Sequence, residues 1–164
     1  ADDDEARRRV DFAFVDARLV QSRQQLMTAI VQAIVGAMRR DPKRPDAEVG
    51  LKTPSIHSDL LWTLHSNNNI AEALRRFGVS RTTRTLILVR VAPPLDAGEL
   101  VQHMTQLVDG TLQTRGLSLP SPALAWSELG TAYKIQDTPA FQHPDTSQVD
   151  ALICSMVASK YVGA

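Results

Sequence analysis

The stretch from Leu61 to Val91 constrains the fold more than any other, because it holds a helix start, a helix end and a strand in succession. Asn69 and Glu72 have the spacing of a capping box. In this motif the asparagine side chain accepts a hydrogen bond from the third helical amide, and the glutamate reaches back to the amide of the cap. A helix is therefore predicted to begin at Ile70. Gly78 follows its apolar face, at the place where a left-handed residue would end it.

Three segments have the composition of strands. Thr85 to Ala92 is an almost unbroken apolar and β-branched run, which predicts a strand covered on both faces. Asp59 to Leu64 is predicted as a second strand that adjoins it. Phe12 to Val20 alternates apolar residues irregularly, so this segment is either a short strand or a loop packed on the core.

Three further helices have clear start signals. Ser22 and Gln25 begin a helix that is predicted to run to about Arg40, and Gly36 within it indicates either close packing of another element or a tolerated surface glycine. Asp96 begins a helix that Gly110 ends. The last helix starts with Ser147 and Asp150, and a short helix (Ser121 to Gly130) and two loops (Asp41 to Gly50, Asp137 to Ser147) lie between these elements.

The inward faces of these helices follow from helical spacing. For the first long helix they are Leu26, Ile30, Ala33, Ile34, Ala37 and Met38; for the third, Leu100, Met104, Leu107 and Val108; for the last, Val149, Leu152, Ile153, Met156 and Val157. We therefore expect an α+β fold, a small mixed, mainly antiparallel sheet packed with several helices, in a single domain from 1 to 164. Residues 1–10, acids followed by arginines, are predicted as a tail or as the end of an amphipathic helix.

Charge and cysteine content exclude several classes of protein. The chain has 18 basic and 18 acidic residues, so any contact with nucleic acid is expected to be confined to a small site. A single cysteine excludes an internal disulfide and a cysteine-based zinc site. Because no apolar run approaches the length of a membrane span and the start is acidic, we expect a soluble, intracellular protein without a membrane segment.

No catalytic constellation is visible. The chain lacks phosphate-binding glycine motifs, HExxH and GxSxG. His57, Ser58 and Asp59 are sequence neighbours whose side chains point in different directions, so they do not form a triad. The four histidines lack ligand spacing, and Cys154 is predicted to be a partly buried, inert thiol. We expect no enzyme activity, no cofactor and no metal.

Two binding surfaces are suggested by the residues themselves. Asn67, Asn68 and Asn69 stand at a helix N-terminus, with Lys52, Arg75, Arg76, Arg81 and Arg84 nearby, which suits an RNA backbone or 3' end. Trp62 or His65 would stack on a base if exposed. The alternative is that the asparagines only cap and turn the chain. The second surface is apolar: the last helix and the end SKYVGA, with Tyr161 and Val162 exposed.

Three motifs carry a resemblance to a known family. SNNNIAEALRRFG followed by LILV, then FAFVDARLV near the start and DALICSM near the end, resemble the kinase-binding small subunit of the KEOPS complex, called EKC in eukaryotes. The resemblance runs from about Phe12 to Met156. AYKIQ, residues 132–136, is similar to a short strand of that family, but the family's first strand and helix are not recognisable, so Thr85 to Ala92 would lack one neighbour. Pro54 stands where the family has arginine.

The resemblance implies a non-catalytic accessory subunit of KEOPS/EKC that binds the small atypical kinase subunit directly and the other subunits indirectly. It also implies support of N6-threonylcarbamoyladenosine formation at position 37 of tRNA, by holding the tRNA 3' CCA end, in cytoplasm and nucleus. The residues assigned to tRNA are Lys52, Asn67, Asn68, Asn69, Arg75 and Arg76; those assigned to the kinase are Ile153, Met156, Val157 and Tyr161. The first long helix, Gln24 to Arg40, and the last helix are the expected sources of the apolar strip that packs on the kinase. The alternatives are a free-standing RNA-binding module and an enzyme with an unrecognised site.

Overall fold

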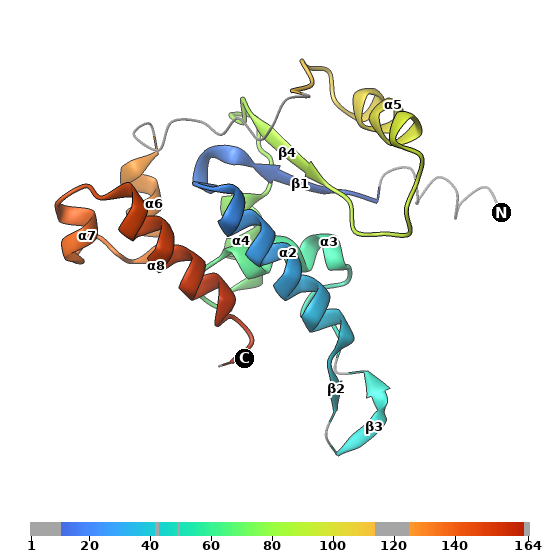
Figure 1. Cartoon of the computed structure of the whole chain (residues 1–164), viewed down its shortest axis with the longest axis horizontal. Coiled ribbons are helices and arrows are strands. Elements are labelled where there is room, and N and C mark those ends of the chain that lie inside the picture. Colours follow the sequence, from blue (N-terminus) through green and yellow to red (C-terminus); the bar gives the residue numbers. More distant parts are fainter. Residues whose placement is uncertain (1–10, 42, 49, 114–124, 163–164) are drawn as a thin grey trace.

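The architecture is that of an α+β protein in which helices dominate. A computed structural model describes residues 11–41, 43–48, 50–113 and 125–162. In chain order the elements are β1 (Ala13–Asp16), the 3-10 turn η1 (Ala17–Leu19), α2 (Arg23–Met38), β2 (Arg40–Asp41), β3 (Arg44–Glu48), α3 (Ile56–Leu64), α4 (Ile70–Phe77), β4 (Leu86–Val89), α5 (Ala97–Leu107), α6 (Trp126–Tyr133), α7 (Pro139–Gln142) and α8 (Thr146–Ala158). The α+β class is confirmed, and both described sheets are antiparallel pairs (Figure 1).

The core lies where α2, α3 and α8 meet the β1–β4 pair. Helix α2 packs against α3 and against α8, and α3 also touches β1 (Figure 1). Ala29 and Ala33 on α2 are fully buried, and their small side chains allow the neighbouring helices to approach closely. The largest fully buried side chains around them come from five elements: Leu19, Leu60, Trp62, Leu64, Phe77, Leu129, Tyr133 and Ile153.

The segment 59–64 is not a strand. It forms most of α3, and Ser55 caps the start of this helix. The hydroxyl oxygen of Ser55 accepts a hydrogen bond from the amide of Ser58. The hydroxyl oxygen of Ser58 in turn accepts a hydrogen bond from the amide of Ser55. These two bonds form a capping box, which starts a helix just before the segment that was expected to be a strand. The expectation failed because α3 is buried on nearly all sides, and a short continuous apolar run does not distinguish a buried strand from a buried helix.

Strand β1 settles the open reading of the segment 12–20. Ala13 to Asp16 pair with Val89 to Leu86 of β4, and the chain then makes one 3-10 turn. β4 is shorter than the predicted strand and its residues are mostly half-buried, so it is not covered on both faces. Its edge away from β1 is unpaired among the described residues.

Helix starts agree with the sequence better than helix ends. The side chains of Ser22, Asn69 and Asp96 cap α2, α4 and α5 as predicted. Gly78, however, has φ −74° and is extended, so the predicted left-handed stop is wrong. Glycine is needed there for another reason: a Cβ would lie 2.3 Å from the carbonyl oxygen of Leu74.

The remaining corrections concern irregular segments. Gly130 does not end α6 but lies inside it against Phe141, and Lys134 with φ 55° ends the helix. Residues 132–136 are therefore the end of α6 and a turn rather than a strand. The expected loop 41–50 contains the β2–β3 hairpin, the loop 137–147 contains α7, and α8 is capped by Asp145. Residues 1–10 and the predicted start at Ser121 lie outside the described residues.

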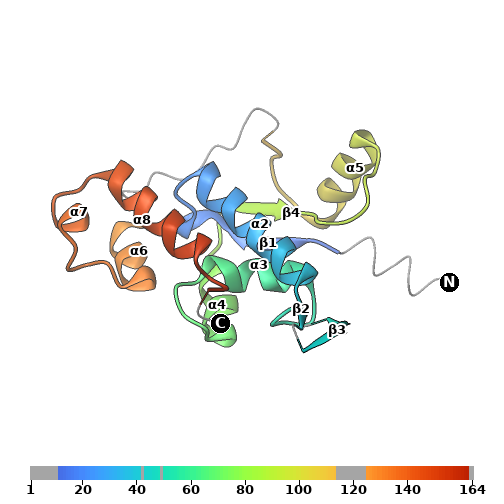
Figure 2. The same cartoon turned by 60° about the horizontal axis from the view of Figure 1, so that its bottom comes forward.

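Helix α5 lies beside β4, on the side away from α6 to α8 (Figures 1 and 2). None of its side chains is fully buried, so the predicted inward residues Leu100, Met104 and Leu107 are only half-covered. Between α5 and the free edge of β4 lies a groove of about 680 Å³ lined by residues 83–88, Met104, Thr105 and residues 108–113. Among the described residues, the edge of β4 away from β1 therefore faces an open groove.

This geometry predicts alternating amide protection along β4. The amide of Ala17 donates to the carbonyl of Thr85 at 3.0 Å, and antiparallel bonds recur at every second pair, so Ile87 and Val89 face β1. The amides of Leu86 and Leu88 face the groove and should exchange with solvent much faster. Residue-resolved hydrogen exchange would check this, and equal protection of Leu86 and Ile87 would contradict the open edge.

Candidate functional site

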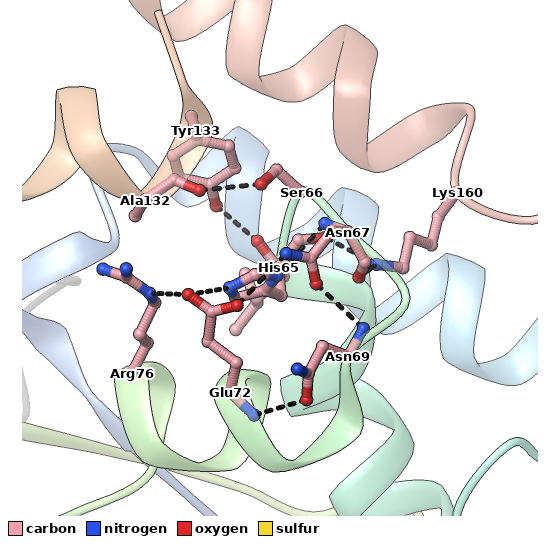
Figure 3. Close-up of polar contacts among 10 residues, drawn as sticks. His65, Ser66, Asn67, Asn69, Glu72, Arg76, Ala132, Tyr133 and Lys160 are labelled. Carbon is pink, nitrogen blue, oxygen red and sulfur yellow. Dashed lines mark hydrogen bonds and ion pairs between the residues drawn. The ribbon is translucent and has the colours of Figure 1, made fainter.

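The residues between α3 and α4, His65 to Asn69, form a turn that we call the asparagine turn. The side chain of Asn69 accepts from the amide of Glu72 at 3.0 Å, and that of Asn67 accepts from the amide of Asn69 at 2.8 Å (Figure 3). The amide group of Asn67 also donates to the Glu72 carboxylate at 3.2 Å. Asn67 and Asn69 are therefore occupied in shaping the turn, whereas Asn68 is exposed and forms no side-chain hydrogen bond in the described part of the chain.

Glu72 links the turn to α4. Its carboxylate accepts from Arg76 Nε at 2.8 Å, and this bond, together with that from Asn67, lowers its pKa to about 2. Glu72 is consequently charged at neutral pH and balances the charge of Arg76. Arg75, one residue earlier, is exposed and has no ion pair among the described residues. Of the two predicted arginines, Arg75 is thus the one available to a ligand.

His65 and Trp62 are both buried, so neither is exposed for stacking as the sequence reading allowed. His65 Nδ1 accepts from the amide of Asn67 at 3.1 Å, and Nε2 lies 3.8 Å from the Glu72 carboxylate. Burial lowers the pKa of His65, which keeps the imidazole neutral at physiological pH.

Lys160 reaches the turn from beyond the end of α8. Its Nζ donates to the carbonyls of His65 at 2.6 Å and Asn67 at 2.5 Å (Figure 3). The same atom lies 4.3 Å from the centre of the Trp62 ring. The side chain is only 7% exposed, and this burial lowers its pKa to about 8. The sequence reading did not single out Lys160, because nothing local indicates which carbonyls it meets.

Tyr161 is buried rather than exposed, which corrects the sequence prediction. Its ring packs against Trp62 at 5.2 Å between centroids, and its hydroxyl donates to Asp59 at 2.5 Å. A Cβ on Gly36 would lie 2.0 Å from this hydroxyl, so close packing is the correct reading of Gly36. Val162 is 87% exposed, as predicted.

Asp59 connects Tyr161 to the segment that carries Lys52. Its second oxygen accepts from the amides of Lys52 and Thr53, both at 2.9 Å. Lys52, Asn68 and Ile70 surround a hollow of about 160 Å³, with Trp62 also in its lining. The structure thereby brings Lys52 next to the asparagine turn, although the predicted strand pairing that suggested this proximity does not exist.

The residues assigned to the kinase lie largely inside the protein. Ile153, Val157 and Tyr161 are buried, and only Met156 is partly exposed. They therefore pack α8 and its C-terminal turn onto the core.

A line of four exposed apolar residues lies on α2 instead. Met27, Val31, Val35 and Met38 are 45, 50, 46 and 69% exposed and form a line along the helix. We call these four residues the α2 stripe. Met38 was expected to face inward, and it does not. The signal was present in the sequence, because α2 has apolar residues on both faces, and only one face can pack on the core.

The potentially reactive side chains outside the asparagine turn are held in structural contacts. His57 accepts from the amide of Val91 at 3.0 Å and lies 2.7 Å from the Asp11 carboxylate. Cys154 is buried, and burial raises its pKa, as the inert-thiol reading requires. Within the described ranges no group of three histidine, cysteine, aspartate or glutamate side chains is placed to hold a metal, and no helix is long and apolar enough to span a membrane.

The buried ammonium group predicts a pH dependence of stability. The pKa of Lys160 falls from 10.5 in the unfolded chain to about 8 in the folded one, so the unfolded state binds more protons between these values. The free energy of unfolding contributed by Lys160 should therefore rise from pH 8 to pH 10.5. Urea unfolding of the wild type and of Lys160→Met at pH 7.5 and 10 isolates this contribution, because other titrating groups are common to both chains. A difference that does not change with pH would contradict burial of the charge.

The comparisons with known proteins agree on one family. A family model described as kinase binding protein CGI-121 matches residues 4–161. The chain is 36% identical to EKC/KEOPS complex subunit CGI121 of Gibberella zeae over 107 residues, which cover 61% of this chain and 50% of that protein. It is 33% identical to the subunit of Aspergillus terreus over 103 residues, covering 62% of this chain and 48% of that protein.

A third relative is matched along nearly the whole chain. The chain is 30% identical to EKC/KEOPS complex subunit CGI121 of Cryptococcus neoformans var. neoformans across 185 aligned positions, covering 97% of this chain and 80% of that protein. It spans about half the length of the first two relatives. Because the family model matches almost every residue, the chain belongs to the CGI-121 family of kinase binding proteins.

Proposed function

We propose that this chain is a non-catalytic accessory subunit of an EKC/KEOPS complex, that it binds the small atypical kinase of that complex, and that it supports tRNA N6-threonylcarbamoyladenosine formation in cytoplasm and nucleus. The observation that carries the proposal is the match of residues 4–161 to a kinase-binding family, whose relatives are named as subunits of that complex. The geometry supports a binding role, because exposed apolar side chains form a line along α2 and the basic side chains of Lys52 and Arg75 are exposed.

The α2 stripe is the surface we assign to the kinase. Its four residues cover about 16 Å of helix at 1.5 Å per residue, a length suited to docking in a shallow apolar groove. Met156 lies on α8, which packs beside α2, and adds a partly exposed apolar side chain. In this proposal Ile153, Val157 and Tyr161 contribute from inside, by holding α8 and the C-terminal turn against α2.

Two charges in the middle of the stripe should weaken the kinase complex. Val31→Glu with Val35→Glu places two carboxylates where an apolar partner would desolvate them, so we expect the affinity to fall at least about tenfold. Both side chains are about half exposed, so the fold should survive. Titration calorimetry with the small atypical kinase from the same source measures the effect.

Val101→Glu on α5 is the matched control, since Val101 is 44% exposed and lies on a separate helix. If the double variant and the control bind the kinase equally well, the stripe is not the docking surface. If the wild-type chain forms no complex at tens of micromolar, the assignment to this complex fails.

The RNA surface of the proposal consists of Lys52 and Asn68, beside the N-terminus of α4, and of Arg75 in the last turn of the same helix. Lys52 and Arg75 are exposed, and Asn68 is free to bind a ligand. The hollow lined by Lys52, Asn68 and Ile70 has room for part of an unpaired nucleotide. We assign this surface to the tRNA 3' CCA end, with Asn67 and Asn69 acting through the shape of the turn and Arg76 screened by Glu72.

The basic residues Lys52, Arg75 and Arg76 should contribute unequally to RNA binding. Lys52→Gln and Arg75→Gln should each weaken binding of a single-stranded RNA ending in CCA and lower the slope of log K against log salt by about 0.7. Arg76→Gln should have a smaller effect, because its partner Glu72 already balances its charge. Fluorescence anisotropy across a salt series measures both quantities.

Arg23→Gln at the start of α2 is the control for loss of one exposed charge outside the proposed RNA surface. Equal losses from all four substitutions would indicate non-specific attraction instead of a site. Tight RNA binding by the chain alone, combined with no kinase complex, would favour the alternative of a free-standing RNA-binding module.

A further inference from the structure

Two consecutive residues after α8 hold the two segments of the proposed RNA surface. We infer that Lys160 and Tyr161 are positioning residues: Lys160 holds the asparagine turn, and Tyr161 holds the backbone of Lys52 through Asp59. The inference rests on the proposed RNA-binding function and adds to it two residues that would not touch the RNA.

The described contacts of the Lys160 ammonium group are all made within the chain. Two of its N–H groups donate to the carbonyls of His65 and Asn67, and the ammonium also faces the Trp62 ring. Burial of an ammonium group without a carboxylate hydrogen-bonded to it costs free energy, and this cost is visible in the lowered pKa. This contact fixes the shape of the turn. One charged donor holds the carbonyls of two residues that precede Asn68, and so it positions Asn68.

Tyr161 acts on the other segment through one carboxylate. Its hydroxyl donates to one oxygen of Asp59, and the other oxygen accepts from the amides of Lys52 and Thr53. Asp59 has no exposed surface, so its position depends entirely on these contacts within the chain. Removing the hydroxyl would release one side of the carboxylate and with it the backbone that directs the Lys52 side chain.

Trp62 contacts both Lys160 and Tyr161 and so joins the two segments that they hold. Lys160 covers its ring at 4.3 Å, Tyr161 packs against it at 5.2 Å, and the same residue lines the hollow between Lys52 and Asn68. The amide of Lys160 donates to the carbonyl of Val157, which continues α8 into the turn. The separation of Lys52 and Asn68 is therefore set by a short C-terminal turn anchored on a core helix.

The test uses two variants that remove only the holding groups. Lys160→Met keeps a long side chain without donors, and Tyr161→Phe removes a single hydroxyl. Each should weaken the binding of a 5'-fluorescein RNA ending in CCA by about tenfold, because buried hydrogen bonds that shape the site are lost. The slope of log K against log salt should not change, whereas loss of a direct phosphate contact would lower it by about 0.7.

Hydrogen exchange tests the same inference without RNA. Lys160→Met should accelerate exchange of the Asn69 amide, and Tyr161→Phe should accelerate the amides of Lys52 and Thr53, since these are the donors whose acceptors are released. The amides in the middle of α2 should stay slow in both variants, which excludes general unfolding.

Two substitutions serve as matched controls. Thr63→Val removes a buried hydroxyl that bonds the carbonyls of Ala29 and Leu60, so it costs stability without touching either segment. Arg23→Met removes an exposed positive charge at the start of α2. Both controls should retain the RNA affinity of the wild type. A Thr63→Val loss as large as that of Tyr161→Phe would overturn positioning in favour of general destabilisation.

The outcomes separate this inference from the function on which it rests. Wild-type affinity in Lys160→Met and Tyr161→Phe overturns the inference and leaves RNA binding intact. A lowered salt slope in Lys160→Met also overturns it, because Lys160 would then contact RNA directly. If the wild-type chain does not bind the RNA, the proposed function fails. The exchange of Asn69, Lys52 and Thr53 then still decides whether the two residues hold these segments.

Discussion

The close approach of other elements to α2 is the constraint on which the rest of the structure depends. Ala29, Ala33 and Gly36 lie along its inner face, and the carbonyl of Ala29 accepts a hydrogen bond from Thr63 of α3. At Gly36 the approach is closest, because the Tyr161 ring occupies the space of a side chain. Only small residues on α2 permit this contact. The placement of α3 and of the C-terminal turn therefore depends on the small side chains of α2.

The small inner face has a consequence for the outer one. Of the larger apolar residues of α2, Leu26 joins alanine and glycine on the buried face, whereas Met27, Val31 and Val35 are all about half exposed. Such a line of side chains is costly to leave in water and is typical of a surface that another protein covers. The internal packing of α2 and its proposed use as a docking face thus have the same cause, namely the distribution of residue size around one helix.

Local signals in the sequence predicted local structure, and contacts between distant residues were missed. The caps at Ser22, Asn69 and Asp96 depend on neighbours within three residues, so spacing alone identified them. The burial of Tyr161 depends on Gly36 and Asp59, which are far away in the chain, and a terminal aromatic residue was therefore expected to be exposed. Lys52 and Asn68 do lie close together, as predicted, but the reason given for it was wrong. The predicted strand pairing does not exist, because the segment 59–64 belongs to α3.

The buried polar side chains near the asparagine turn make their hydrogen bonds within the chain. Lys160, Asp59 and His65 are the buried ionisable groups near the turn, and each makes hydrogen bonds to backbone groups of the same chain. Groups engaged in this way hold structure, since moving a proton or a ligand would break the contacts that compensate their burial. The groups that remain free near the turn are Lys52, Asn68 and Arg75, which are exposed and chemically suited to hydrogen bonds and charge. A surface built in this manner presents a fixed shape and charge to a partner, and its specificity then depends on how accurately the buried groups place the exposed ones.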